Sequence, residues 1–121
     1  MHIKNFILWL TIFASYPALA YNFAECILDK LPGSSNQATH GAVFNICREK
    51  SNEKYTEILK GSGRGFFGHA DGNSCVLKKA KETSYQLSAM QIAFACRCLY
   101  DPPEYNGQTC INPFSDTNFG K

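Results

Sequence analysis

Residues 26–48 read CILDKLPGSSNQATHGAVFNICR, and this stretch decides the predicted fold. When the chain is shifted by 49 positions, the stretch aligns without a gap to residues 75–97, CVLKKAKETSYQLSAMQIAFACR. Seven of the 23 aligned pairs are identical, although choosing the shift to match cysteines supplies two of the seven. Ordinary residue frequencies of roughly 5–7% predict about one or two identities by chance. We therefore predict an internal duplication, with repeat one at about residues 25–50 and repeat two at about residues 74–99.

Each repeat is predicted to form a helical hairpin. In repeat one, a first helix over residues 25–31 stops at the turn-forming pair Pro32-Gly33. Ser35 is predicted to cap a second helix from residue 36 to about residue 50, because its hydroxyl can accept hydrogen bonds from the first free amides. Repeat two keeps a capping serine, Ser84, but lacks the Pro-Gly pair. The predicted apolar faces of the two second helices consist of Ala42, Val43, Ile46 and Cys47, and of Ala89, Ile92, Ala93 and Cys96.

The six cysteines are predicted to form three disulfide bonds. Two of the intervals between them, from 26 to 47 and from 75 to 96, are equal in length. An antiparallel hairpin places the start of its first helix beside the end of its second, so each of these pairs can meet. Six cysteines allow many pairings, and the repeat favours one of them. The predicted pairs are Cys26–Cys47, Cys75–Cys96 and Cys98–Cys110.

The composition is that of one small domain. The chain has 121 residues, of which 45% are hydrophobic and 18% are charged. We predict an all-α fold, a small disulfide-stapled domain of two repeated helical hairpins joined by a Gly-rich loop, with a short helix over residues 53–60. The formal net charge of +2 disfavours a nucleic acid as partner.

The first twenty residues resemble a secretory signal peptide. A lysine-bearing start precedes an apolar run over residues 6–14, and Ala18-Leu19-Ala20 supplies the small residues of a cleavage site. The run is well short of the ~20 residues that cross a bilayer. We therefore predict a signal peptide at residues 1–20 and one mature domain at residues 21–121, without a membrane span. The protein is predicted to be exported, either periplasmic or secreted, where disulfide bonds persist.

The chemistry-bearing residues are few. Pairing all six cysteines leaves no thiol for catalysis. His40 is expected on a solvated helix face, which leaves His69 with Asp71 as the best candidate for a small secreted hydrolase. Together with Asn73, these residues supply too few ligands for a metal site. The pattern Gly-x-Gly-x-x-Gly at residues 63–68 lacks the preceding strand of a dinucleotide site. No cofactor is predicted.

Residues 61–73 hold five of the nine glycines, and two interpretations of this segment stay open. It is either a connector whose Phe66 and Phe67 pack on the core, or a recognition loop that contacts a partner through Arg64, Phe66, Phe67 and His69. We expect an exported, non-catalytic binding or inhibitory protein whose partner is another protein. The alternatives are the hydrolase and an envelope assembly or stress factor that acts on other exported chains.

Overall fold

The computed structural model of the chain describes residues 22–51, 55–65 and 68–111. Within these ranges the regular structure is helical, apart from one isolated antiparallel bridge between Leu59 and Thr109. The elements are, in chain order, α1 (Phe23–Lys30), α2 (Gln37–Lys50), the 3-10 helix η1 (Tyr55–Glu57), α3 (Gly72–Lys79) and α4 (Gln86–Tyr100). The prediction of an all-α fold is confirmed.

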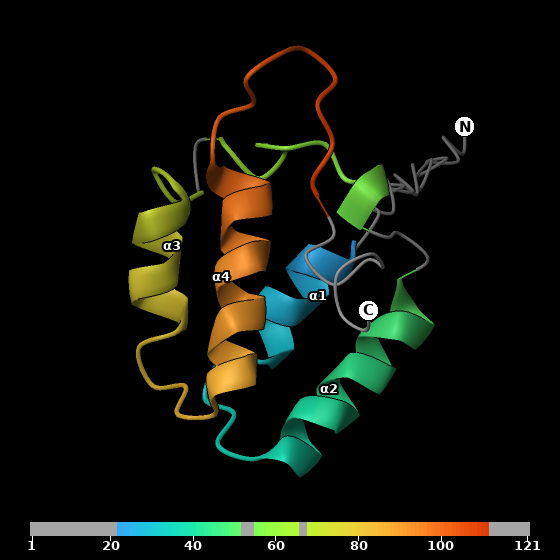
Figure 1. The fold of residues 1–121 in the computed structure, drawn as a ribbon, viewed down its shortest axis with the longest axis vertical. Helices are drawn as coiled ribbons and strands as arrows, with labels where there is room; N and C mark the ends of the chain where they lie inside the picture. Colours follow the sequence, from blue (N-terminus) through green and yellow to red (C-terminus); the bar gives the residue numbers. More distant parts are fainter. Residues whose placement is uncertain (1–21, 52–54, 66–67, 112–121) are drawn as a thin grey trace, which may run out of the picture.

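The helices form two hairpins that meet at α4. The hairpin of α1 and α2 contacts the hairpin of α3 and α4 because α1 and α3 both pack against α4. Figure 1 shows α4 running between α3 and α1, with α2 beyond α1. The core between them contains Ile27 of α1 and its C-cap Leu31, Ile92 and Leu99 of α4, and Ile58 after η1, all of them at most 2% exposed. Each buried side chain of this size contributes about 1.5–3 kcal/mol to folding. The predicted helical hairpins are therefore confirmed.

All three predicted disulfide bonds are present. The Cα atoms are 5.6 Å apart for Cys26–Cys47, 5.5 Å for Cys75–Cys96 and 5.3 Å for Cys98–Cys110. The six cysteines are at most 5% exposed, so the bonds lie within the core as well as across the hairpins.

The caps of the second helices are not the predicted serines. The N-cap of α2 is Asn36, one residue after Ser35, and its side chain accepts a hydrogen bond from the Thr39 amide at 2.9 Å. Asparagine caps a helix as well as serine does, so the helix begins one residue later. The N-cap of α4 is Tyr85 rather than Ser84, and its side chain makes no capping hydrogen bond. The prediction of serine caps was wrong in both hairpins.

Three of the four helix bounds of the second hairpin follow those of the first at one interval, and the end of α4 lies one residue beyond it. Both ends of α3 follow the corresponding ends of α1 at the same interval, and the start of α4 follows the start of α2 at that interval too. The first helices start from equivalent caps, Asn22 and Asp71. This offset equals the shift that aligns the two halves of the sequence, and the duplication itself stays a prediction.

Two further details of the sequence analysis are corrected. Of the predicted apolar face of α2, Val43 and Cys47 are buried, but Ala42 is exposed and Ile46 is 39% exposed. The reason is that the main helix contact of α2 is with α1 alone. The short helix expected over residues 53–60 is described only as the three-residue η1. After η1 the chain leaves the helix because the Lys60 amide bonds the Gln108 carbonyl and the Cys110 amide bonds the Ile58 carbonyl.

His40 is not on a solvated face, and it takes part in the contact between the hairpins. Its ring is half-buried against Phe44 and Tyr85, with centroids at 4.8 and 5.4 Å. Its Nδ1 lies 2.8 Å from Oγ of Ser88, and the Ser88 hydroxyl donates to Oγ of Ser34 at 3.0 Å. The three side chains thus form one hydrogen-bonded chain between the hairpins, in which the ring's tautomer sets whether Nδ1 donates or accepts.

Candidate functional site

The Gly-rich segment is held against the C-terminal end of α4. The last four carbonyls of a helix have no partner within the helix. In α4 the Arg97 carbonyl accepts from the Asp101 amide. The next two carbonyls, of Cys98 and Leu99, accept from the amides of Gly61 and Gly63, each at 2.8 Å. The fourth, that of Tyr100, accepts from Nη1 of Arg64 at 2.9 Å. The segment therefore completes the end of α4.

Glycine is required where this segment approaches α4. A Cβ atom on Gly63 would lie 3.0 Å from both Leu99 Cβ and Tyr100 Cε1. Gly61 has a φ of +80°, a conformation that other residues rarely adopt. A Cβ atom on Gly68 would lie 2.5 Å from the Gly63 carbonyl oxygen. These glycines allow close backbone contact at the described positions of the segment.

The predicted partner-binding residues that the structure describes therefore make different contacts. Arg64 uses its guanidinium within the chain, on the Tyr100 carbonyl. Phe66 and Phe67 lie outside the described residues, so neither interpretation of the segment is decided by them. His69 is half-buried, and its ring meets the Tyr100 ring edge-to-face at 4.8 Å.

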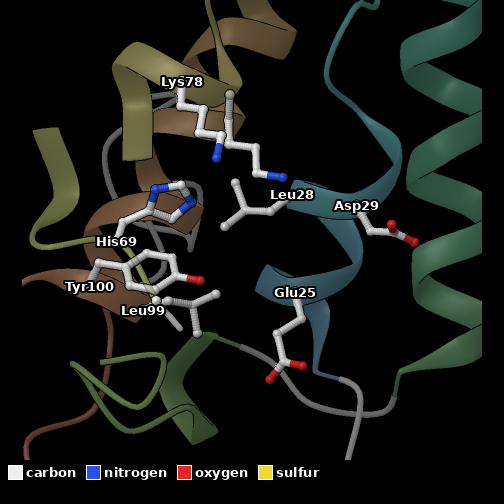
Figure 2. A pocket seen from close by; sticks show the side chains of 9 residues that line it. Glu25, Leu28, Asp29, His69, Lys78, Leu99 and Tyr100 are labelled. Atoms are coloured by element: carbon white, nitrogen blue, oxygen red, sulfur yellow. The ribbon is translucent and has the colours of Figure 1, made fainter. Parts of the chain in front are cut away.

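His69 and Tyr100 line a groove of about 430 Å³. The groove exists because α1 and α3 both pack on α4 and leave a space above Leu99. Figure 2 shows Leu28 and Glu25 on α1, His69 and Tyr100 on the opposite side, and Lys78 reaching from α3 into the space between His69 and Leu28. The lining residues are Glu25, Leu28, Asp29, Gly68, His69, Lys78, Lys79, Leu99 and Tyr100. We call this space the α1–α3 groove.

A second hollow of about 290 Å³ adjoins the α1–α3 groove. The two share Lys78 and Lys79, and the second is completed by the two hairpin turns, with Pro32 and Gly33 facing Lys81 and Glu82. The α3 side of both hollows is therefore basic.

The charges of the groove act on its two aromatic groups. Burial lowers the pKa of His69 below its ordinary value, and the positive charges of Lys78 and Lys79 lower it further. Burial raises the pKa of Tyr100, and the carboxylate of Glu25 raises it further. His69 is therefore neutral at pH 7, next to two ammonium groups.

Lys78 and Lys79 have no ion-pair partner within the described ranges. The ion pair present among the described residues joins Asp29 to Lys30, with the charged atoms 3.8 Å apart. The Glu25 carboxylate accepts from Nδ2 of Asn22 at 2.7 Å, at the N-terminus of α1. The two lysines thus leave a local excess of positive charge on the α3 wall.

Asp71 does not act together with His69. Its carboxylate caps α3 by accepting from the Ser74 amide at 2.8 Å. This backbone hydrogen bond, followed by one from the Ser74 side chain, lowers the pKa of Asp71 below its ordinary value. Of the two residues considered for a hydrolase, His69 therefore contacts the Tyr100 ring and Asp71 caps α3.

The described residues contain neither a metal-binding cluster nor a helix that could span a membrane. Residues 22–51, 55–65 and 68–111 contain no group of three or more His, Cys, Asp or Glu side chains placed to hold a metal ion. None of the helices in these ranges has the length and apolar character needed to cross a membrane.

Comparison of the chain with protein-family models, with curated proteins and with solved structures finds no match.

Of the groove residues, His69 was a candidate from the sequence and the others were not. Lys78 and Lys79 lie within predicted repeat two, and Tyr100 comes just after it. Helical periodicity indicates which face of α4 is buried, but it does not say which helices pack there. One usable signal was the alignment of Asp29 with Lys78, a reversal of charge between equivalent positions of the two hairpins.

Proposed function

We propose that the chain is an exported, non-catalytic binding or inhibitory protein that holds a polypeptide partner in the α1–α3 groove. The observation that carries the proposal is the charged groove itself, where side chains of α1, α3 and α4 converge. Sites for small molecules are mostly apolar concavities, whereas the exposed parts of protein interfaces are polar. Apart from Leu28, Leu99 and Gly68, every residue that lines the groove is polar or charged, which favours a polypeptide.

The non-catalytic part of the proposal is supported by how the reactive groups are used. All six cysteines are in disulfide bonds, and Asp71 is a helix cap. A general base usually needs a partner that fixes its tautomer, whereas the His69 ring packs on the ring of Tyr100.

Export is supported by the three disulfide bonds, which are stable in oxidising compartments. The signal-like residues 1–20 agree with this compartment, and we propose the periplasm or the cell exterior. Intact mass spectrometry of the exported protein is expected to give a chain that starts at Tyr21. A chain that keeps residues 1–20 would contradict this part of the proposal.

We also propose that the two hairpins are copies of one ancestral unit, joined by the Gly-rich segment. Three of the four helix bounds are offset by the same shift that aligns the two sequences, and this agreement supports the duplication. In such a duplicated fold, the first helices of the two copies, α1 and α3, can come to differ in charge where they line the groove.

A photo-crosslinking amino acid at position 69 tests the binding function. Exported protein that carries benzoylphenylalanine in place of His69 is expected to form a discrete adduct with one other polypeptide upon illumination. The matched control carries the same amino acid in place of Arg48, which is exposed on α2 outside the groove. An absence of adducts at position 69, or the same adducts at both positions, would reject the groove as the binding surface.

A second candidate function is hydrolysis, and one observation favours it. A neutral His69 touches the phenol ring of Tyr100 in an open groove, and neutral histidine can act as a general base. If this function is correct, turnover of a p-nitrophenyl ester or of fluorescein-labelled casein is lost in both His69→Ala and Tyr100→Phe. The assembly-factor alternative is separated by the crosslinks, since such a factor would give adducts with several exported chains.

A further inference from the structure

We infer that the basic corner of the α1–α3 groove, formed by Lys78, Lys79 and His69, binds a carboxylate of the partner polypeptide. The inference rests on the proposed binding function and adds the chemistry that the groove recognises. It names a group, a carboxylate, that reaches the groove either on an acidic side chain or at the C-terminus of a chain.

The first step is the surplus of cations at this corner. Lys78 and Lys79 are neighbours in the last turn of α3, and neither has a carboxylate within 4.0 Å in the described residues. Both line the groove together with His69, and their positive charges lower the pKa of its ring. The two ammonium groups and the neutral His69 ring thus line one corner of the groove, where a carboxylate would relieve the repulsion between the two ammonium charges.

The second step is that the fold itself does not require two unpaired lysines at this position of a hairpin. At the equivalent place in the first hairpin, Asp29 and Lys30 form an ion pair of opposite charges. In the second hairpin Lys78 stands where Asp29 would be, and Lys79 aligns with Lys30. The second hairpin therefore lacks the internal anion that the first one has.

The third step is the shape of the site. The helices α1 and α3 have eight residues each, so the groove between them is about 12 Å long. An extended chain covers this length with about four residues at ~3.3 Å each. The site therefore fits a short extended segment that carries one acidic group, and Glu25 and Asp29 on α1 oppose a run of several acidic groups.

The binding should depend on pH through His69. The titratable or charged groups that line the groove with His69 are Lys78 and Lys79 of α3, Tyr100 of α4, and Glu25 and Asp29 of α1. A bound carboxylate stabilises the protonated ring, so binding and protonation of His69 support each other. Affinity is therefore expected to rise as the pH falls from 8 towards 6.

The experiment titrates the isotope-labelled, disulfide-bonded protein with defined hexapeptides and follows its amide and histidine NMR signals. One peptide carries a single internal glutamate and blocked ends, and a second carries a free C-terminal carboxylate and no acidic side chain. Controls are blocked peptides with glutamine or lysine at the same place, and inorganic phosphate. We expect shifts at Lys78, Lys79 and Gly68 with the carboxylate peptides, and a rise in the pKa of His69. The better of the two carboxylate peptides identifies the source of the group.

The variants test which charges matter. Lys78→Gln with Lys79→Gln is expected to weaken carboxylate binding about 5–10-fold, as expected for two partly exposed ion pairs. The matched control, Arg48→Gln with Lys50→Gln, removes two charges from the last turn of α2 and should leave binding unchanged. Salt at about 1 M, where the Debye length is ~3 Å, should abolish most of the shifts.

Several results would overturn the inference. They are an absence of shifts at millimolar peptide, equal shifts with the glutamine peptide, tighter binding of phosphate than of either carboxylate peptide, or equal losses in the two double variants. If a partner crosslinks at position 69 and its capture does not change in the Lys78/Lys79 variant, the binding function stands and the carboxylate inference fails. If the peptides bind as expected but no partner crosslinks, the chemistry of the corner stands and the proposed function fails.

Discussion

His40 is the residue at which a change of charge acts on the contact between the hairpins. Its ring lies between Phe44 and Tyr85, and its Nδ1 is hydrogen-bonded to Ser88, which is fully buried. Burial lowers the pKa of His40 below its ordinary value. Protonation of the ring places a charge in a partly desolvated position.

We expect the free energy of unfolding to decrease as the pH falls from about 7 to 5. A histidine whose folded-state pKa is lowered takes up its proton first in the unfolded state, whose pKa is about 6.5. The loss therefore begins as the pH falls through that value and is complete below the folded-state pKa. Urea unfolding of His40→Gln should show a smaller decrease than the unaltered protein. His69→Gln serves as the comparison, because burial and the two lysines lower the pKa of His69 too. An unchanged pH dependence in His40→Gln would contradict this account.

The glycines of the Gly-rich segment differ in the room that they leave for an added methyl group. Gly63→Ala is expected to destabilise the protein by about 1–3 kcal/mol, because the added Cβ would press on Leu99 and Tyr100 at 3.0 Å. Gly65→Ala is the matched control, since a Cβ atom there meets nothing within 4 Å. It should change stability by less than about 1 kcal/mol. Thermal melts of both variants check this, and equal melting temperatures would show that the segment is not held against α4.

At the scale of the helices, the sequence predicts the hairpins because their pattern is local. Helical spacing, the Pro32-Gly33 turn and the equal cysteine intervals all lie within one repeat. The exact caps were missed because Ser35 and Asn36 are both good capping residues and stand side by side. The cap of α4 is Tyr85 instead of the predicted Ser84, and the Tyr85 amide bonds the carbonyl of Ser34 in the other hairpin, a tertiary contact that the local sequence does not reveal.

Each hairpin disulfide is expected to stabilise the protein by about 3 kcal/mol, because the two closed loops have the same length. Replacing Cys26 and Cys47 by serine should also make α2 the first protease-sensitive element, since its main helix contact is with α1. Replacing Cys75 and Cys96 should leave α3 better protected, because α3 packs extensively on α4. Limited proteolysis with mass spectrometry measures the order of cleavage. Early cleavage in α3 in either variant would contradict the packing described.

At the scale of the whole molecule, the groove could not be predicted from the sequence because it arises between the hairpins. Glu25, Lys78 and Tyr100 belong to three helices, and they meet only because α1 and α3 pack on neighbouring faces of α4. Of the groove residues, only His69 was a candidate from the sequence, through its place beside the glycines. The same holds for His40, whose partner Ser88 is distant in the chain.

The buried bridge between Ser34 and Ser88 should make the two hairpins unfold together. Ser34 is 3% exposed and Ser88 is fully buried, and their hydroxyls are 3.0 Å apart. Ser88→Ala leaves the buried Ser34 hydroxyl without this partner, at about 1–3 kcal/mol. After Ser34→Ala the Ser88 hydroxyl keeps its bond to His40, so the loss should be smaller. The double variant should lose less than the sum of the two single losses, because residues in one hydrogen-bond network are coupled. Urea unfolding followed by circular dichroism is expected to give one transition for the unaltered protein and a coupling of about 0.5–3 kcal/mol between the two sites. Additive losses, or two separate transitions in the unaltered protein, would mean that each hairpin is held together by its own disulfide and core rather than by this contact.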